Sequence, residues 1–336
     1  MEVDTATCPT KGFSAKSNFL QVFAWIGFLV LVVIFIKLVL SILKGLYTCV
    51  LGRMLGMTVD WRQLGRWAVV TGATDGIGKA YAQELAFRGF DIILISRNPE
   101  KLKNVANEIE TIYGVQTKCI PIDFTGGIEI YDVIKKEIDG MEIGVLVNNV
   151  GISYAYAEYF NKVPNAEELF NNLIKTNVIS CTLMMRMIMP QMVERKKGVI
   201  INMSSFSAAN PVPLLSVYAA TKTYVDYLSQ AVQVEYKSKG LIIQSVLPYF
   251  VSTRMSKIRR ASLMVPTPET YVKWAIETVG IESRTYGYPP HKLQGYFQEI
   301  LYKYLPTAVI MYFTLKNTKS IRSRYYKKYG IVDDRK

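Results

Sequence analysis

Tyr218 and Lys222 are the residues whose types and spacing point most directly to chemistry. They stand four residues apart in the run SVYAATK, so on a helix they lie one turn apart on the same face. A lysine ammonium ~4 Å from a phenol favours the phenolate by about 4 kcal/mol at an effective dielectric of ~20. That attraction would bring the pKa of the tyrosine from ~10 toward ~7, where it can donate or accept a proton. The same spacing arises by chance on helix surfaces, so its meaning depends on the rest of the chain.

The composition argues against several competing chemistries. The 336 residues include one histidine, His291, which argues against a Ser-His-Asp hydrolase, a histidine zinc enzyme and a two-histidine iron site. His291 follows two prolines and is predicted to be a surface or loop residue; a place at a substrate entrance is the alternative. The four cysteines show no pairing or metal spacing and indicate a reduced compartment: Cys8, Cys49, Cys119 and Cys181.

Positive charge is concentrated at the C-terminal end. The chain has a net charge of +13, and eight Lys/Arg against two Asp between Lys316 and Lys336 contribute +6 of it. A solvated tail, an anionic membrane surface and a phosphate-bearing substrate are all compatible with this pattern. The aromatic residues do not alternate with the basic ones as in nucleic-acid-binding modules, so no nucleic-acid partner is predicted.

One segment near the N-terminus is strongly apolar. Phe19 to Ile36 reads FLQVFAWIGFLVLVVIFI, eighteen residues without a charge, and a helix needs ~20 apolar residues to span a bilayer. A cleaved signal peptide usually has an apolar core of ~7–15 residues, followed by a small-residue cleavage site. We therefore predict a retained transmembrane anchor. The nearby Lys and Arg residues, two before the segment and three after it, favour a cytosolic C-terminal side.

Apolar strands and helical segments alternate through the middle of the chain. This alternation predicts a Rossmann-like, doubly wound α/β domain with a parallel sheet covered on both faces. Helices are predicted at 79–88 and 99–113. Six strands are predicted, at 68–70, 91–96, 117–122, 144–147, 199–203 and 241–246.

A glycine-rich turn follows the first of these strands. The run TGATDGIG, from Thr71 to Gly78, has the spacing G-x-x-x-G-x-G and precedes a helix. Such a turn lets backbone N–H groups approach a diphosphate at a helix N-terminus. The second strand ends with Ser96-Arg97 rather than with an acidic residue. A cation there suits the 2′-phosphate of NADP(H), although Arg97 is also compatible with an ordinary exposed strand end.

Several motifs in order resemble the short-chain dehydrogenase/reductase family over roughly residues 65–287. They are the TGATDGIG turn, Asp123 after the third strand, the run NNVG from Asn148, Asn177, Ser205, and Tyr218 with Lys222. The resemblance implies that Tyr218 protonates a carbonyl oxygen, with Lys222 lowering its pKa and Ser205 orienting the substrate oxygen. Asn177 would hold a water that links Lys222 to solvent. The neighbouring Ser204 could be mistaken for Ser205, but the thirteen-residue spacing to Tyr218 favours Ser205.

The resemblance also implies a binding site for NADP(H). Asp123 would contact adenine, Asn149 the adenosine side, and Thr253 the nicotinamide carboxamide; Asp123 could instead cap the next turn, and Asn177 could be a capping or solvated residue. One position departs from the commoner family pattern, because Tyr249 rather than Gly follows Pro248. The full predicted set is Gly72, Thr74, Asp75, Gly76, Ile77, Gly78, Arg97, Asp123, Asn149, Gly151, Tyr218, Lys222, Val251 and Thr253.

The resemblance implies reduction of the 3-keto group of a long- or very-long-chain 3-oxoacyl-CoA during fatty acid elongation. Reduction of a 17-ketosteroid, a 17β-hydroxysteroid dehydrogenase activity, is the alternative, and a non-catalytic membrane scaffold is a remote one. The four cations after the sixth strand fit an acyl-CoA head group or a solvated helix face: Arg254, Lys257, Arg259 and Arg260. The resemblance also implies a location in the endoplasmic reticulum membrane, and the Lys/Arg pattern favours a cytosolic domain. A homodimer and contacts with other elongation enzymes are left open.

These features divide the chain into five parts. They are an N-terminal tail (1–18), the anchor (19–43), a linker (44–64), the dehydrogenase domain (65–287) and a C-terminal extension (288–336). Within the extension, the apolar stretch 305–315 is too short to span a membrane. It either lies at the membrane interface or packs against the core or a partner.

Overall fold

The computed structural model describes residues 11–46 and 59–331. Two compact units divide the chain at Gly45–Leu46. The first contains one long helix, α1 (Lys11–Leu46), in which Phe19–Lys37 is long and apolar enough to cross a membrane. This agrees with the predicted anchor. Cys8, Cys49 and the last five residues lie outside the described ranges, whereas Cys119 and Cys181 are free thiols.

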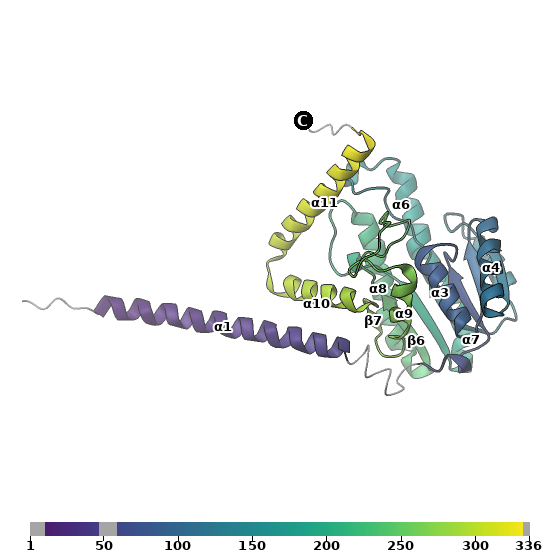
Figure 1. The fold of residues 1–336 in the computed structure, drawn as a ribbon, viewed down its shortest axis with the longest axis horizontal. Helices are drawn as coiled ribbons and strands as arrows, with labels where there is room; N and C mark the ends of the chain where they lie inside the picture. The colour runs from purple at the N-terminus through teal and green to yellow at the C-terminus, as the bar shows by residue number, and fades with distance from the viewer. Residues whose placement is uncertain (1–10, 47–58, 332–336) are drawn as a thin grey trace, which may run out of the picture. The chain divides into compact units, whose positions relative to one another are not determined.

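The second unit is built on one parallel sheet of seven strands (Figure 1). Their order across the sheet is β3-β2-β1-β4-β5-β6-β7, with the change of direction beside β1 that is typical of doubly wound folds. The predicted fold class and six predicted strands are confirmed. The strands are β1 (Trp67–Thr71), β2 (Asp91–Ser96), β3 (Thr117–Pro121), β4 (Ile143–Asn148), β5 (Gly198–Met203), β6 (Leu241–Val246) and β7 (Arg284–Thr285).

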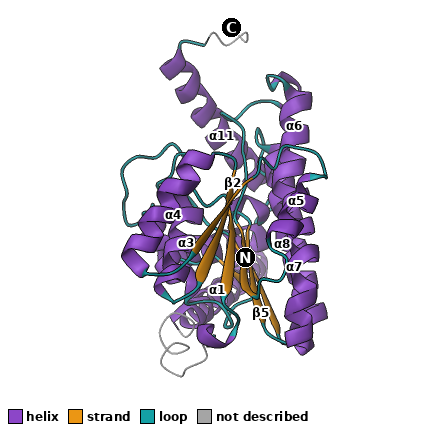
Figure 2. Ribbon diagram, turned by 90° about the vertical axis from the view of Figure 1, so that its right-hand side faces the viewer, coloured by secondary structure: helices purple, strands orange, loops and turns teal. Residues whose placement is uncertain are grey.

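Helices cover both faces of the sheet, as Figure 2 shows. Because both faces are covered, the central strands are mainly apolar, and β4 and β5 are buried at every position. One apolar core joins the sheet to α3 (Gly76–Phe87), α4 (Pro99–Tyr113) and α9 (Pro268–Ile276). The opposite core joins it to α5 (Ile130–Glu137), α7 (Ser180–Arg195) and α8 (Ser216–Tyr236).

The edge strand β7 and the C-terminal helices were not anticipated in this form. β7 has two residues, Arg284 and Thr285, and pairs with Ser245 and Val246 of β6, so it carries too little periodicity to be read from the sequence. The chain then forms α10 (Pro289–Tyr304) and α11 (Thr307–Tyr329). The stretch 305–315 is therefore not a separate helix, because most of it forms the first turns of α11.

Short helices complete the path between strands and helices. They include α6 (Ala166–Ile174), the π-helical turn η4 (Lys175–Ile179), and the 3-10 turns η2 (Trp61–Gln63), η3 (Phe160–Lys162), η5 (Phe206–Ala208) and η6 (Lys237–Lys239). The turn η4 carries Asn177 and η5 follows Ser205 directly, so two irregular turns lie beside the predicted catalytic residues. Single π turns occur frequently at functional sites.

Candidate active site

The glycine-rich turn connects β1 to α3 in a conformation that its glycines make possible. Gly72 and Gly76 have φ values of 66° and 55°, in the left-handed region that side chains disfavour. Asp75 caps α3 by accepting a hydrogen bond from the Gly76 amide at 2.8 Å. A Cβ on Gly78 would lie 2.3 Å from the Gly72 carbonyl oxygen. The turn is therefore closed tightly around its own backbone, with N–H groups at the start of α3.

Asn149 fixes this turn to the end of the neighbouring strand β4. Its Nδ2 donates to the carbonyl oxygens of Thr71 at 3.0 Å and Gly72 at 3.2 Å. Its backbone N–H donates to Thr71 Oγ1 at 3.0 Å. A contact of Asn149 with the adenosine side stays a prediction, because the residue lines the cavity, while its side-chain amide nitrogen holds the turn. The physical reason is that β1 and β4 are adjacent parallel strands, so their carboxyl ends meet.

Two cations line the cavity at the end of β2. Arg97 is exposed there, as the sequence predicted. Lys101, in the first turn of α4, lines the same wall and was missed, although the sequence places it one helical turn beyond Arg97. The side chain of Asn98 caps α4 by accepting from the Lys101 amide at 2.9 Å, which fixes the start of that turn.

Asp123 lines the cavity beyond β3 and also closes its own turn. Its Oδ1 accepts from the backbone N–H of Thr125 at 3.0 Å and from Thr125 Oγ1 at 2.9 Å. The capping alternative is therefore correct for one carboxylate oxygen. The side chain is exposed and lines the cavity, so a contact with adenine stays a prediction.

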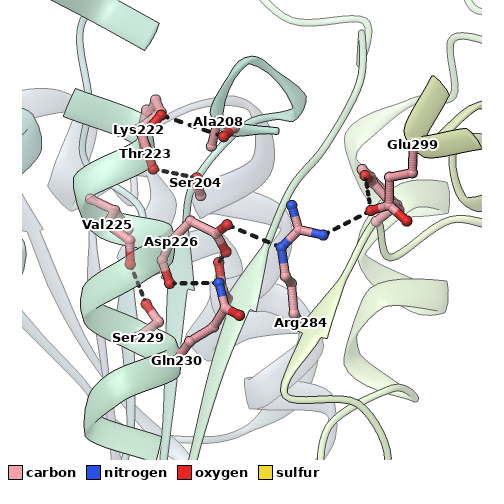
Figure 3. A network of polar contacts seen from close by, with 12 residues as sticks. Ser204, Ala208, Lys222, Thr223, Val225, Asp226, Ser229, Gln230, Arg284 and Glu299 are labelled. Atoms are coloured by element: carbon pink, nitrogen blue, oxygen red, sulfur yellow. Dashed lines mark hydrogen bonds and ion pairs between the residues drawn. The ribbon is translucent and has the colours of Figure 1, made fainter. Parts of the chain in front are cut away.

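Tyr218, Lys222 and Ser205 lie together on one wall of the cavity. Lys222 Nζ is 6.0 Å from the centre of the Tyr218 ring and donates to the Met203 carbonyl oxygen at 2.9 Å. Ser204 Oγ donates to the Lys222 carbonyl oxygen at 2.7 Å (Figure 3). Ser204 therefore ties β5 to α8. This leaves Ser205, whose hydroxyl accepts from the Ser207 amide at 3.2 Å, as the serine beside Tyr218.

The pKa values of this group differ from the prediction. Burial raises the pKa of Tyr218 above its ordinary value, and a hydrogen bond with Ser205 only partly opposes the rise. Burial lowers the pKa of Lys222 to about 8. The prediction that Lys222 brings the pKa of Tyr218 toward neutrality is therefore wrong for the protein groups on their own. Burial disfavours the phenolate and the ammonium alike, and the ammonium donates its hydrogen bond to the Met203 carbonyl oxygen.

Asn177 and Lys222 converge on Gly151. A Cβ at Gly151 would lie 3.2 Å from Lys222 Nζ and 3.3 Å from Asn177 Oδ1. The Asn177 amide is held by the backbone of Ile152, accepting from its N–H at 2.9 Å and donating to its carbonyl at 3.0 Å. It also donates to Thr221 Oγ1 at 3.0 Å. Asn177 is thus buried and positioned beside the lysine, as the family resemblance requires.

The loop after β6 closes against the glycine-rich turn. A Cβ at Gly76 would lie 3.2 Å from the Thr253 methyl carbon, and Arg254 Nε pairs with Asp75 Oδ2 at 2.9 Å. Val251 is buried, and it lines the cavity together with Thr253. These contacts place the two predicted binding segments on opposite sides of one cleft.

Two of the four cations after β6 are used within the protein. Arg254 pairs with Asp75, and Lys257 Nζ donates to the Ala155 carbonyl at 2.6 Å. Arg259 and Arg260 are exposed. Of the four predicted cations, Arg259 and Arg260 are therefore the two that fit the alternative of solvated side chains.

The C-terminal helices complete the cavity, a role that the sequence did not reveal. Their lining residues are Gln294, Gln298 and Tyr302 of α10 and Phe313, Thr314, Asn317, Thr318 and Ile321 of α11. Tyr249 connects this wall to the catalytic side: its ring stacks on Phe206 with centroids 4.4 Å apart, and its hydroxyl donates to Gln298 Oε1 at 2.5 Å. Tyr249 therefore faces the cavity, as its unusual position suggested.

The placement of His291 on a surface loop is wrong. The two prolines before it begin helix α10, where proline is well tolerated, and His291 is fully buried in the first turn. Its Nε2 lies 3.2 Å from the Met264 carbonyl oxygen. Burial lowers the pKa of His291 to about 4, so it is neutral at physiological pH and packs among aromatic rings.

The cavity has a volume of about 1010 Å³, at the upper end of the ~300–1,000 Å³ of a typical ligand site. It extends from the glycine-rich turn and Arg97 to α11. The glycine cradle, the N-terminus of α3 that follows it and the two cations fit a dinucleotide with a further phosphate. Most of the predicted site residues line it, whereas Gly78 and Asn177 stand just behind the wall.

Comparisons with known proteins agree with this geometry. The family model described as short chain dehydrogenase matches residues 66–263. A very-long-chain 3-oxoacyl-CoA reductase-B of Danio rerio is 47% identical over 304 residues, covering 90% of this chain and 96% of the relative. A very-long-chain 3-oxoacyl-CoA reductase of Anas platyrhynchos is 53% identical over 265 residues, covering 79% and 84%.

The fold is also similar to that of a solved structure. A short-chain dehydrogenase from Sphingobium yanoikuyae in complex with NADPH is 27% identical, with a TM-score of 0.57. The match covers 63% of this chain and 83% of that one. The resemblance inferred from the motifs is confirmed, and the protein belongs to the short-chain dehydrogenase family of oxidoreductases.

Proposed function

We propose that the protein reduces the 3-keto group of long- and very-long-chain 3-oxoacyl-CoA to a 3-hydroxyacyl-CoA, using NADPH. The observation that carries this proposal is one continuous cavity. It joins a glycine-rich turn and Arg97 to the Tyr218–Lys222–Ser205 group and then to α10 and α11. Relatives 47–53% identical over most of the chain are named for this reaction.

NADPH would be held by the turn from Gly72 to Gly78 and by Thr253, with Arg97 and Lys101 toward its 2′-phosphate. When bound, it supplies a hydride to the carbonyl carbon. Tyr218 supplies the proton to the carbonyl oxygen. Ser205 donates a hydrogen bond to the same oxygen and, with Tyr218, stabilises the developing alkoxide.

Lys222 and Asn177 support Tyr218 from behind the wall. The ammonium of Lys222 favours the phenolate that remains after proton transfer, since opposite charges lower the pKa of an acid. Asn177 holds the backbone around Ile152, and its Oδ1 lies beside Gly151, as Lys222 Nζ does. A water relay from Lys222 past Asn177 to solvent would return the proton.

Reduction of a 17-ketosteroid is the second candidate. The cavity has apolar walls as well as polar ones, including Phe206, Leu215 and Phe250, so a flat apolar ketone fits its chemistry. NADPH oxidation by membranes that carry the protein separates the two, with a 3-oxoacyl-CoA and a 17-ketosteroid as parallel substrates. We expect turnover of the thioester; reduction of the steroid alone would overturn the proposal.

The same proposal places the protein in the endoplasmic reticulum membrane with its α/β unit in the cytosol. The apolar span Phe19–Lys37 and the excess of basic residues after it support this arrangement. Exposed apolar residues near the start of α11, such as Leu305 (43%) and Tyr312 (63%), suit contact with the membrane interface. Protease sensitivity of the α/β unit in sealed microsomes tests the orientation, and protection would contradict it.

We also propose that the protein forms a homodimer, with α7 and α8 at the interface. The outer face of α8 exposes Tyr227 (69%) and Val234 (80%), which suits burial against a second copy or another elongation enzyme. Crosslinking in detergent between cysteines placed at these positions distinguishes the two partners by the mass of the product.

A further inference from the structure

Carboxamide side chains from the C-terminal extension face the substrate end of the cavity. Gln298 of α10 and Asn317 of α11 both line it, and both lie beyond residues 66–263, which match the family model. They are therefore additions to the part of the fold that holds the dinucleotide. A carboxamide is a neutral group that offers both donors and an acceptor.

Gln298 is held in one orientation by Tyr249. The Tyr249 hydroxyl donates to Gln298 Oε1 at 2.5 Å, and the Tyr249 ring is fixed by stacking on Phe206, the residue after Ser205. One of the two lone pairs of Oε1 is thus used. Within residues 59–331, no protein acceptor is hydrogen-bonded to Gln298 Nε2, which leaves its N–H groups for a ligand in the cavity.

The helix that carries Gln298 is fastened to the catalytic helix. Asp226 of α8 accepts from Arg284 Nε at 3.0 Å, and Arg284 also pairs with Glu299 Oε1 of α10 at 2.9 Å (Figure 3). Glu299 accepts a further hydrogen bond from the Tyr286 hydroxyl at 2.8 Å. Because Glu299 adjoins Gln298, this network fixes the position of Gln298 relative to the helix of Tyr218 and Lys222.

The helix that carries Asn317 is anchored by a buried ion pair five residues further along α11. Arg322 Nε pairs with Glu158 Oε1 at 2.8 Å, and the two side chains are 3% and 2% exposed. The threonines on either side of Asn317 in the cavity wall use their hydroxyls on the helix backbone, Thr314 on Ile310 and Thr318 on Thr314. Asn317 is therefore the group of this wall with both a donor and an acceptor for a ligand.

We propose that Gln298 and Asn317 form a subsite for the amide-bearing pantetheine arm of a coenzyme A thioester. This inference rests on the proposed function and names the groups that would recognise the thioester. Each secondary amide of that arm presents one N–H and one C=O, which need partners when they leave water. The Gln298 carboxamide, which Tyr249 orients, and the Asn317 carboxamide together supply both, whereas a ketosteroid offers no amide for them to meet.

The test compares substrates with and without the arm in the full-length enzyme. Gln298→Leu and Asn317→Leu remove the amides at similar volume, and the substrates are a 3-oxoacyl-CoA and the methyl ester of the same 3-oxo acid. We expect each variant to raise the KM of the thioester by about tenfold, the loss of one good hydrogen bond. The kcat for the thioester and the KM of the methyl ester should stay within about twofold.

Two further variants control for packing. Tyr249→Phe keeps the ring on Phe206 but frees Gln298, and we expect a smaller rise in the KM of the thioester alone. Asn107→Leu makes the same change on the exposed face of α4, away from the cavity, and should alter neither substrate. An unchanged Kd for NADPH in every variant shows that the fold is intact.

The results separate this inference from the proposed function. An equal rise for thioester and methyl ester, or no rise for the thioester, overturns the subsite while wild-type turnover of the thioester upholds the function. Wild-type enzyme that reduces the methyl ester or a 17-ketosteroid but not the thioester overturns the proposed function itself. A rise in KM for the steroid alone would assign Gln298 and Asn317 to a steroid and also overturn the subsite.

Discussion

Replacing Lys222 with methionine should make the protein more stable while removing its activity. Lys222 is 5% exposed and makes no ion pair within residues 59–331. Its titratable neighbours are the Tyr218 phenol and the thiol of Cys181 on α7. Burial raises the pKa of that thiol to about 12, so both neighbours are neutral at pH 7 and do not compensate the ammonium.

The magnitude follows from the pKa of Lys222. Burial lowers it from 10.5 to about 8, and because each factor of ten in proton affinity is ~1.4 kcal/mol, the buried charge costs about 3 kcal/mol at pH 7. Methionine removes that cost but leaves the Met203 carbonyl without its donor, a loss of about 1 kcal/mol. We expect Lys222→Met to raise the free energy of unfolding by about 2 kcal/mol at pH 7.

The pH dependence gives the more specific test. Between pH 8 and 10.5 the folded protein has released this proton while the unfolded chain still binds it, so wild-type stability gains from this group as the pH rises. The advantage of Lys222→Met should therefore be largest below pH 8 and shrink by about 3 kcal/mol toward pH 10.5. Urea unfolding of the NADPH-free protein in detergent, at pH 7 and pH 10, measures the difference. A variant that is less stable than wild type at pH 7 would refute this reasoning.

Three more predictions concern binding, packing and the catalytic wall. Arg97→Asp should lower the preference for NADPH over NADH by roughly 10–100-fold, because a charge-assisted hydrogen bond contributes about 1.5–3 kcal/mol; steady-state kinetics with both cofactors check it, and an unchanged preference would contradict the assignment. Glu158→Gln should cost about 3–5 kcal/mol of unfolding free energy, since it removes the carboxylate charge that faces the buried Arg322 guanidinium, and Glu158→Leu combined with Arg322→Met should recover most of it. Wild-type stability of the single variant in urea would count against that ion pair. Gly151→Ala should lower kcat about tenfold with little change in the Kd for NADPH, because the new Cβ displaces Lys222 and Asn177; normal turnover would mean that their position does not matter.

The dinucleotide half of the fold could be predicted because its signals are local. The alternation of apolar strands and helices and the spacing of the glycines are determined by neighbouring residues. The same holds for the one-turn separation of Tyr218 and Lys222, which lie on one helix.

The substrate half depends on contacts between distant residues. Gln298 reaches Tyr249 across 49 residues, and Arg322 reaches Glu158 across 164. The amphipathic character of α11 is weak, because it buries Ile310, Thr318 and Arg322 rather than an apolar stripe. No local sequence pattern predicts such pairs. The burial of Tyr218 likewise depends on distant segments, and this burial raises its pKa where the sequence predicted a decrease.

His291 shows how a local signal was misread. The two prolines before it indicate the end of a regular element as readily as the first turn of a helix. The tertiary contacts of His291 with Met264 and with the rings of Tyr249 and Tyr271 decide between these outcomes. These contacts come from segments that the sequence did not connect.

The central claim is that Tyr218 delivers the proton while NADPH reduces a 3-oxoacyl-CoA. Single-turnover reaction of wild type and Tyr218→Phe with NADPH deuterated at the transferred position tests it most directly. We predict deuterium at C3 of the 3-hydroxyacyl-CoA from wild type, and an unchanged Kd for NADPH but a transfer rate lower by roughly 10²–10⁴-fold in the variant. Transfer at the wild-type rate in Tyr218→Phe, or no deuterium in the acyl product, would contradict the claim.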